Sequence, residues 1–386
     1  MVSDEPIAFI DLKAQRRRIG ERMTTAILSA VDDGQYILGP QVGEFERKLA
    51  TFCGAQHAIG TANGTDALGL CLMALGLKPN DAVICPAFTF AATAEAVAWL
   101  GATPIFVDID EATYNMDPKA LPLALDMARR AGLTPRAVIT VDLFGLMADY
   151  DPIEAFCRDN GLSLICDSAQ GFGASYKGRR AGAIGDFTTA SFFPAKPLGC
   201  YGDGGAILTN DAGYSELLRS LRFHGKGADK YDNVRIGMNS RLDTLQAAIL
   251  LEKLAIFEEE IAARQAVAAR YDNALRDFVV TPFVPAHCVS VWAQYTIRIP
   301  ATQRARFIDG MKARGVPTNI YYPKPLNQQT AYKRFPVAGN GLPVSEKVAK
   351  EVVSLPMHPY LDEATQDRVI SAVLQVLSDI GAVAGA

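Results

Sequence analysis

The chain has 386 residues, of which 49% are hydrophobic and 21% charged, a composition typical of a globular enzyme of about two domains. Its formal net charge of -4 argues against nucleic-acid binding, which requires a concentrated basic face. No apolar run reaches the roughly 18 residues that a membrane-spanning helix needs, and the N-terminal stretch lacks the apolar core of a signal peptide. We therefore expect a cytoplasmic protein that binds neither nucleic acid nor membrane.

Cysteine and histidine spacing carries no metal signature. The seven cysteines form no C-x-x-C pair, and the four histidines lie far apart along the chain. We expect reduced cysteines that pack as small core residues, and no metal site.

The N-terminal part predicts a short arm, Ile7 to Leu12, then a helical stretch that ends near Gly34, and a second helix from Val42 to Cys53. Beyond it, continuous apolar runs of strand length alternate with helical segments such as residues 66–75 and 92–100. The expected strands cover residues 57–61, 82–85, 104–107, 137–141, 162–166, 187–193 and 206–209. This alternation predicts an α/β fold with a mostly parallel sheet between helices, and ligands at the carboxyl ends of its strands.

The C-terminal part predicts a smaller α+β unit. It begins with a long charged helix at residues 257–278, continues with a strand at 293–299 and reaches an amphipathic helix at 304–314. We therefore expect a large domain with the N-terminal arm, residues 1–255, and a small C-terminal domain, residues 256–386.

Lys196 lies between an apolar strand and a glycine-rich turn, flanked by Pro194 and Pro197. An ordinary exposed loop lysine is one interpretation. The apolar neighbours favour another, in which partial desolvation lowers the pKa of the amine. The neutral amine would then be available as a nucleophile toward an aldehyde.

Three other strands are followed by residues suited to a ligand. Gly64 and Thr65 would begin a helix whose free N–H groups suit a phosphate, although a plain helix cap is the alternative. Asp167 places a carboxylate at the end of a buried strand, where it needs a cation unless it serves as a cap or in an internal ion pair. Phe88 could stack on a flat ligand or pack in the core.

Pyridoxal 5'-phosphate would use all of these residues together. It needs a lysine for its aldehyde, an acid beside its ring nitrogen, an aromatic face and a phosphate cradle. The acid keeps the ring protonated, so that the ring can absorb the electrons released when a Cα proton leaves. The sequence therefore predicts an enzyme that depends on this cofactor.

Six stretches resemble one family, the DegT/DnrJ/EryC1/StrS sugar aminotransferases, over nearly the whole chain. They are QYILGP from residue 35, ANGTDAL from 62, PAFTFAATAEAV from 86, CDSAQGFGASYKGRRAG from 166, SFFPAKPLGCYGDGGAI from 191 and GMNSRLDTLQAAIL from 237. The resemblance implies the type I aspartate-aminotransferase fold, with pyridoxamine 5'-phosphate as the intermediate form of the cofactor. It also implies a homodimer with shared active sites.

By position, the resemblance implies a role for each residue around the cofactor ring. Lys196 would form the internal aldimine and Asp167 would pair with the ring nitrogen. Phe88 would lie over the ring, and Gln170 near its hydroxyl group.

The resemblance also implies the phosphate contacts. Gly64, Thr65 and Ser191 would bind the phosphate from one subunit. Asn239 would reach the same phosphate from the second subunit, with Arg241 close by.

The loop KPLGCYGDGG, from Lys196, resembles those of members that move the amino group of L-glutamate to C-3 of a nucleotide-linked keto sugar. The substrate we expect is UDP-2-acetamido-2-deoxy-3-oxo-D-glucuronate, used for bacterial surface polysaccharides such as lipopolysaccharide O-antigen. A neutral sugar, UDP-3-keto-N-acetylglucosamine or a dTDP-3-keto-6-deoxyhexose, is the alternative. The sequence departs from the acid-specific pattern at Tyr321, where a histidine is expected. Candidate sugar contacts are His224, Arg241, Tyr321 and Tyr322.

Other classes of protein fit the sequence less well. A sugar dehydratase on the same fold replaces the lysine with histidine, whereas Lys196 is present. A nicotinamide oxidoreductase would need G-x-G-x-x-G after the first strand, which residues 62–67 do not supply. A regulator that binds the cofactor without turnover is the non-enzyme alternative.

Overall fold

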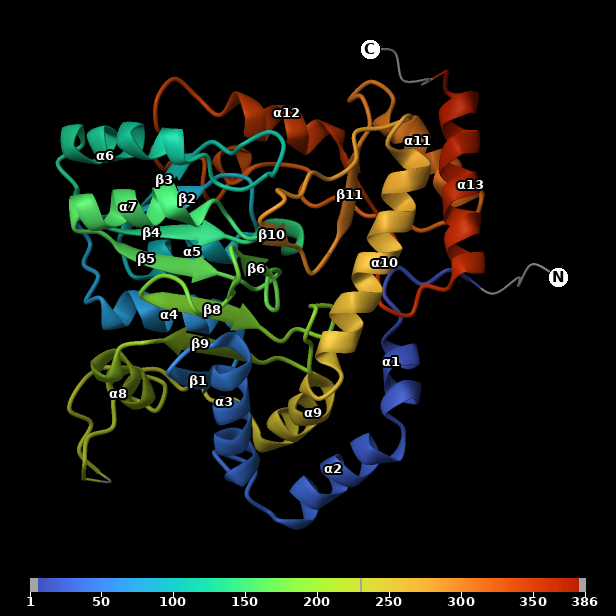
Figure 1. Cartoon of the computed structure of the whole chain (residues 1–386). Coiled ribbons are helices and arrows are strands. Elements are labelled where there is room, and N and C mark those ends of the chain that lie inside the picture. Colours follow the sequence, from blue (N-terminus) through green and yellow to red (C-terminus); the bar gives the residue numbers. More distant parts are fainter. Residues whose placement is uncertain (1–5, 230, 382–386) are drawn as a thin grey trace.

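A seven-stranded sheet forms the centre of the computed structural model, which describes residues 6–229 and 231–381 (Figure 1). Its strand order is β1-β9-β8-β5-β4-β2-β3. The strands are β1 (His57–Thr61), β2 (Asp81–Pro86), β3 (Thr103–Val107), β4 (Thr134–Val141), β5 (Ser163–Asp167), β8 (Phe187–Ser191) and β9 (Gly205–Thr209). Strand β9 is antiparallel to both of its neighbours, β1 and β8, whereas the other neighbouring pairs are parallel. The predicted α/β fold with a mostly parallel sheet is confirmed.

Helices cover both faces of this sheet, and each face has its own core. Alternate residues of β2 show the division, because Ala82 and Ile84 pack into one core while Val83 and Cys85 pack into the other. The first core is covered by α3 (Pro40–Cys53), α6 (Leu121–Arg130), α7 (Tyr150–Asn160) and α9 (Thr244–Leu254); the second by α4 (Gly64–Ala74), α5 (Ala92–Trp99) and α8 (Ala212–Leu221). Burial on both faces explains why the strands are continuously apolar in the sequence.

The N-terminal helical stretch is broken into two helices, α1 (Leu12–Ile19) and α2 (Glu21–Asp32), where the sequence predicted one. Gly20 separates them with a φ of 64°. This left-handed conformation is easily reached by glycine and cannot continue a right-handed helix.

The C-terminal part has a core of its own, to which the N-terminal Ile7 also contributes. Helix α10 (Phe257–Leu275) leads into it from α9, and β11 (Tyr295–Arg298) pairs antiparallel with β12 (Val352–Leu355). Helices α11 (Arg304–Ala313) and α13 (Glu363–Asp379) complete this core. Helix α12 (Pro343–Glu351) packs instead in a separate cluster with Phe88 and Phe144. The division of the chain between residues 255 and 256 remains a prediction.

Short elements connect these units. A small sheet of order β10-β6-β7 is formed by β6 (Ser175–Tyr176), β7 (Arg179–Arg180) and β10 (Cys288–Val289). Three single-turn 3-10 helices are η1 (Pro118–Ala120), η2 (Leu143–Gly145) and η3 (Leu326–Gln328).

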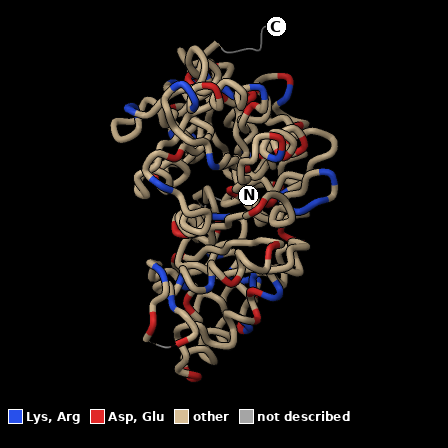
Figure 2. The backbone as a smooth tube through the Cα atoms, turned by 90° about the vertical axis from the view of Figure 1, so that its left-hand side faces the viewer, with Lys and Arg blue, Asp and Glu red and all other residues tan. Residues whose placement is uncertain are grey.

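Charged residues of both signs are interspersed over the molecule (Figure 2). All seven cysteines are free thiols; six are buried and Cys288 is half-buried. Within residues 6–229 and 231–381, no helix is both long and apolar enough to cross a membrane.

Candidate active site

Lys196 lies in a tightly closed loop between β8 and β9, residues 192–204, which is called the lysine loop below. Its backbone N–H donates to the carbonyl of Phe193 at 2.8 Å, and the N–H of Cys200 donates to the carbonyl of Phe192 at 2.7 Å. Lys196 is half-buried. Burial lowers the pKa of its amine, and the nearby carboxylate of Asp167 partly offsets this shift. The amine is therefore not that of a freely solvated surface lysine.

Asp167 is the last residue of β5 and lies opposite Thr189 of the neighbouring strand β8. It is only 7% exposed. Burial raises the pKa of its carboxyl group, while the N–H of Ala169, which donates at 3.1 Å, and the nearby amine of Lys196 lower it. The Thr189 hydroxyl also lies close enough to the carboxylate to lower its pKa. In the described part of the chain the carboxylate has no ion-pair partner within 4 Å, so it is available to a ligand that carries a proton to this point.

A second buried carboxylate, Asp142, lies directly behind Asp167. Its Oδ2 accepts from the Ser168 hydroxyl at 2.5 Å, and its Oδ1 accepts from the Tyr150 hydroxyl at 2.7 Å and the Ala148 N–H at 3.0 Å. Its own N–H donates to the carbonyl of Asp167 at 2.9 Å. Sequence analysis missed this residue, although an aspartate directly after the predicted strand 137–141 was the available signal.

Gly64 and Ser191 meet at the start of helix α4. A Cβ added to Gly64 would lie 2.7 Å from the Cβ of Ser191, so only glycine allows this approach. Asn63 caps the helix by accepting from the N–H of Asp66 at 2.8 Å, which leaves the N–H groups of Gly64 and Thr65 at the open end. The cap and the phosphate cradle are therefore compatible, and the structure brings these predicted phosphate contacts together.

Gln170 connects two predicted parts of the site. Its Oε1 accepts from the N–H of Phe144 at 2.8 Å, and its Nε2 donates to the hydroxyl of Tyr322 at 3.0 Å. The buried ring of Phe88 meets the ring of Tyr322 edge-on, with centroids 6.3 Å apart. Burial raises the pKa of Tyr322, so its hydroxyl stays protonated.

Tyr321 contacts Asn319 and Phe9 and forms no hydrogen bond with Gln170. Its hydroxyl lies 3.4 Å from the side-chain nitrogen of Asn319, and its ring packs against Phe9. The two neighbouring tyrosines therefore differ, because only Tyr322 contacts Gln170.

His224, Asn239 and Arg241 form a separate group, carried by a segment that comprises residues 221–229 and 231–241 and is called the flap below. The backbone of Phe223 bridges to Asn239, and the Arg241 guanidinium lies 4.8 Å from the centre of the Phe223 ring. Within the described residues, no hydrogen bond or ring contact joins this group to Lys196, Asp167, Gln170 or Tyr322. His224 and Asn239 are exposed on the surface of the single chain.

The flap is nevertheless anchored close to the phosphate cradle. The hydroxyl of buried Ser240 accepts from the N–H of Ala62 at 3.1 Å. Asn239 thus projects outward from a fixed position beside residues 62–65, which suits a residue that acts outside its own chain.

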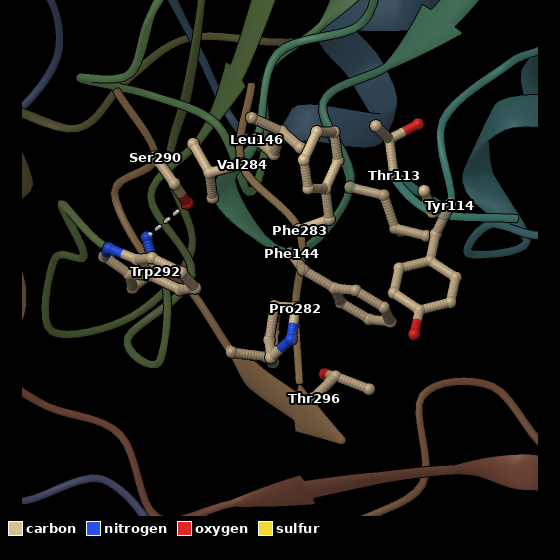
Figure 3. Close-up of a pocket in the computed structure, with 13 residues that line it drawn as sticks. Thr113, Tyr114, Phe144, Leu146, Pro282, Phe283, Val284, Ser290, Trp292 and Thr296 are labelled. Atoms are coloured by element: carbon tan, nitrogen blue, oxygen red, sulfur yellow. Dashed lines mark hydrogen bonds between the residues drawn. The ribbon is translucent and has the colours of Figure 1, made fainter. Parts of the chain in front are cut away.

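A separate cavity of about 20 Å³ lies behind Phe144 (Figure 3). The side chains of Tyr114, Phe283 and Trp292 help to line it. A space of this size holds about one water molecule, so it is not a site for a cofactor or a sugar.

The residues around Lys196 fit the chemical groups of pyridoxal phosphate. A desolvated amine and a buried carboxylate without an ion pair lie close enough to shift each other's pKa. A glycine-lined helix start lies at the end of the adjacent strand β8. These are the groups that the cofactor's aldehyde, ring nitrogen and phosphate require.

Comparison with known proteins agrees with this chemistry. Residues 17–374 match the family described as the DegT/DnrJ/EryC1/StrS aminotransferase family. The chain belongs to this family. It is accordingly a sugar aminotransferase with the type I fold, and its cofactor is pyridoxal 5'-phosphate.

Individual relatives cover almost the whole chain. A Pseudomonas aeruginosa protein named UDP-2-acetamido-2-deoxy-3-oxo-D-glucuronate aminotransferase is 51% identical over 95% of this chain and 99% of its own length. The crystal structure of a family member from Brucella abortus is 53% identical, with a TM-score of 0.94 over 96% of this chain and 99% of that one. The Bacillus subtilis NtdA protein, solved with the bound cofactor PMP, is 30% identical, with a TM-score of 0.85 over 98% of this chain and 87% of that one.

Proposed function

We propose that this enzyme moves the amino group of L-glutamate to C-3 of a UDP-linked 3-keto sugar, and that the sugar is UDP-2-acetamido-2-deoxy-3-oxo-D-glucuronate. The observation that carries the proposal is the 51% identity, over nearly both full lengths, to a protein named for that substrate. The reaction would serve the synthesis of bacterial surface polysaccharides such as O-antigen, and it would take place in the cytoplasm, where nucleotide sugars are made.

The cofactor supplies the electron sink for this transfer, and the chain's residues hold and move the protons. Lys196 provides the amine that would hold the cofactor, and the same amine would carry the proton taken from Cα of the amino donor. Its lowered pKa supports this role, because a base must be partly neutral to accept a proton. Asp167 holds the proton of the ring nitrogen, and its burial keeps that interaction out of water.

The residues around the cofactor ring would orient the cofactor. Phe88 provides an apolar face. The Oε1 of Gln170 is fixed by the N–H of Phe144, and the second N–H of its amide would donate to the ring hydroxyl. Gly64, Thr65 and Ser191 hold the phosphate. Because Tyr322 bonds to Gln170, we place it at the boundary between the cofactor and the sugar.

The active enzyme would be a homodimer with shared sites. Several large apolar side chains are exposed: Phe193 in the lysine loop is 52% exposed, Phe90 beside Tyr322 57%, and Ile236 on the flap 90%. We infer that a second subunit covers these side chains, because their burial would remove apolar surface from water. A second subunit placed there would let Asn239 and Arg241 complete the neighbouring site and bring His224 toward the nucleotide sugar.

The substrate is tested by comparing kcat/KM for the acidic sugar and for UDP-3-keto-N-acetylglucosamine, each with L-glutamate. We expect the acid to be preferred by at least about tenfold, because a site that pairs a buried carboxylate discriminates against its absence. Tyr321→Phe and Tyr322→Phe show whether either hydroxyl contributes to that preference. Lys196→Ala should use neither sugar, and Lys119→Ala, a change of an exposed lysine on η1, is its control. Equal or better use of the neutral sugar would contradict the assignment to the acid.

A further inference from the structure

Helix α9 carries a lysine that is buried completely. Lys253 has no exposed surface, and its Nζ donates to the carbonyl of Gly199 at 2.6 Å. The amine also lies 4.3 Å from the centre of the Tyr201 ring. Among the described residues, no carboxylate lies within ion-pair distance of it. The ammonium group of Lys253 therefore contacts the lysine loop and has no counter-ion within ion-pair distance among the described residues.

A second side chain of α9 holds the same segment. The Oε1 of Gln246 accepts from the N–H of Tyr201 at 2.9 Å, and its Nε2 donates to the carbonyl of Tyr201 at 3.4 Å. Gln246 and Lys253 are seven residues apart and therefore lie on one face of the helix. That face contacts the backbone from Gly199 to Tyr201.

The contacted segment controls the position of Lys196. Gly199 folds back so closely that an added Cβ would lie 2.5 Å from the carbonyl oxygen of Pro194 and 2.6 Å from that of Phe193. The same Phe193 carbonyl accepts from the N–H of Lys196. Holding Gly199 in place therefore restrains the turn that presents the Lys196 amine.

The position of Lys253 is costly for a residue that only fills space. Burial disfavours its ammonium form and lowers its pKa to about 8, which the nearby carboxylate of Glu260 partly offsets. The Tyr201 ring and the Gly199 carbonyl offset part of the cost as well. An apolar side chain of similar length would avoid this cost and would lose the bond to the loop.

We propose that Lys253, together with Gln246, is a positioning residue that fixes the lysine loop from behind, so that the Lys196 amine meets the cofactor and the amino donor in one geometry. This inference rests on the proposed role of Lys196. Helix α9 would then affect catalysis through the lysine loop, although Lys253 and Gln246 contact neither substrate nor cofactor.

The test compares Lys253→Met with Ile249→Ala in the cofactor-loaded enzyme. Ile249 lies on the same helix and is buried, but it packs against Ile19 and Met23 and not against the lysine loop. For each variant we would measure the melting temperature, kcat, KM for L-glutamate and the pH midpoint of the near-visible absorbance of the bound cofactor. That last readout needs no sugar substrate.

For Lys253→Met we expect kcat to fall about tenfold, equivalent to about 1.4 kcal/mol, with KM changed less than about twofold. The absorbance midpoint should also move by at least about half a pH unit. Ile249→Ala should lower the melting temperature and leave the midpoint and kcat in place. A Lys253→Met enzyme that loses only melting temperature would overturn the proposal.

Two further variants keep the test decisive if Lys253→Met does not fold. Lys253→Gln retains a donor and should recover part of kcat. Gln246→Leu removes the other anchor from a half-buried position, and it should shift the midpoint in the same direction as the Lys253 variants. An unchanged midpoint and kcat in Gln246→Leu would overturn the proposal. If the unmodified protein lacked the absorbance band, the proposed function itself would fail instead.

Discussion

Asp142→Asn should change how the stability of the protein depends on pH. Asp142 is fully buried beside Asp167, and no lysine or arginine of the described residues forms an ion pair with it. Burial raises the pKa of its carboxyl group to about 6, although the Ser168 and Tyr150 hydroxyl groups lower it in part. Asparagine can preserve the local bonds, because Oδ1 still accepts from Tyr150 and Ala148 while Nδ2 donates to the oxygen of Ser168.

The magnitude follows from the pKa difference between the folded and unfolded states. The folded value of about 6 lies above the ordinary value of 3.8, so the folded protein binds this proton more tightly. The stabilisation is therefore complete below about pH 3.8 and is lost as the pH rises through 6. At pH 5, one unit below the folded pKa, it amounts to about 1.4 kcal/mol, and at pH 8 it is close to zero.

The assay is urea unfolding of the unmodified protein and Asp142→Asn at pH 8 and at pH 5. We expect the unmodified protein to gain about 1.4 kcal/mol relative to the variant when the pH falls from 8 to 5. Asp126→Asn, a change of an exposed carboxylate on α6, is the control and should show almost no such difference. A relative change for Asp142→Asn below about 0.5 kcal/mol, or of opposite sign, would refute the reasoning, since burial would then not disfavour the ionised form.

Four other changes test the site. Lys196→Ala should abolish the near-visible absorbance of the bound cofactor and amino transfer, whereas Asp167→Ala should retain the cofactor and lose at least about a hundredfold in kcat, measured by steady-state kinetics. Gly64→Ala should weaken cofactor binding about tenfold or more in an equilibrium titration, because the new methyl group would meet Ser191 at 2.7 Å. Mixing the inactive Lys196→Ala and Asn239→Ala proteins under conditions of verified subunit exchange should restore part of the activity, since a hybrid dimer holds one intact site; no recovery would mean that one chain builds each site.

The sheet could be predicted from the sequence because its strands are buried on both faces and are continuously apolar. The residues 57–61 were predicted as a strand with the same bounds as β1. The direction of β9 could not be predicted, because a short apolar run does not indicate whether its neighbours are parallel. The break at Gly20 was also missed, since helical periodicity continues on both sides of it.

The site was partly predictable for a related reason. Residues that follow parallel strands meet at one edge of the sheet, so the sequence alone indicates that Lys196 and Asp167 lie near each other. Asp142 and Lys253 were not recognised, because a charged residue in sequence does not reveal whether it will be buried. Tyr321 and Tyr322 are adjacent in sequence and were treated alike, yet only the structure separates the one that bonds to Gln170.

The central claim is that this enzyme uses Lys196 to move an amino group from L-glutamate to C-3 of the keto sugar. The most direct measurement is mass spectrometry and nuclear magnetic resonance of the sugar product, formed from L-glutamate labelled with heavy nitrogen and UDP-2-acetamido-2-deoxy-3-oxo-D-glucuronate. We predict a product with the labelled nitrogen bonded to C-3, and none with the Lys196→Ala enzyme. A labelled product from Lys196→Ala, or no product from the unmodified enzyme in the presence of bound cofactor, would contradict the account.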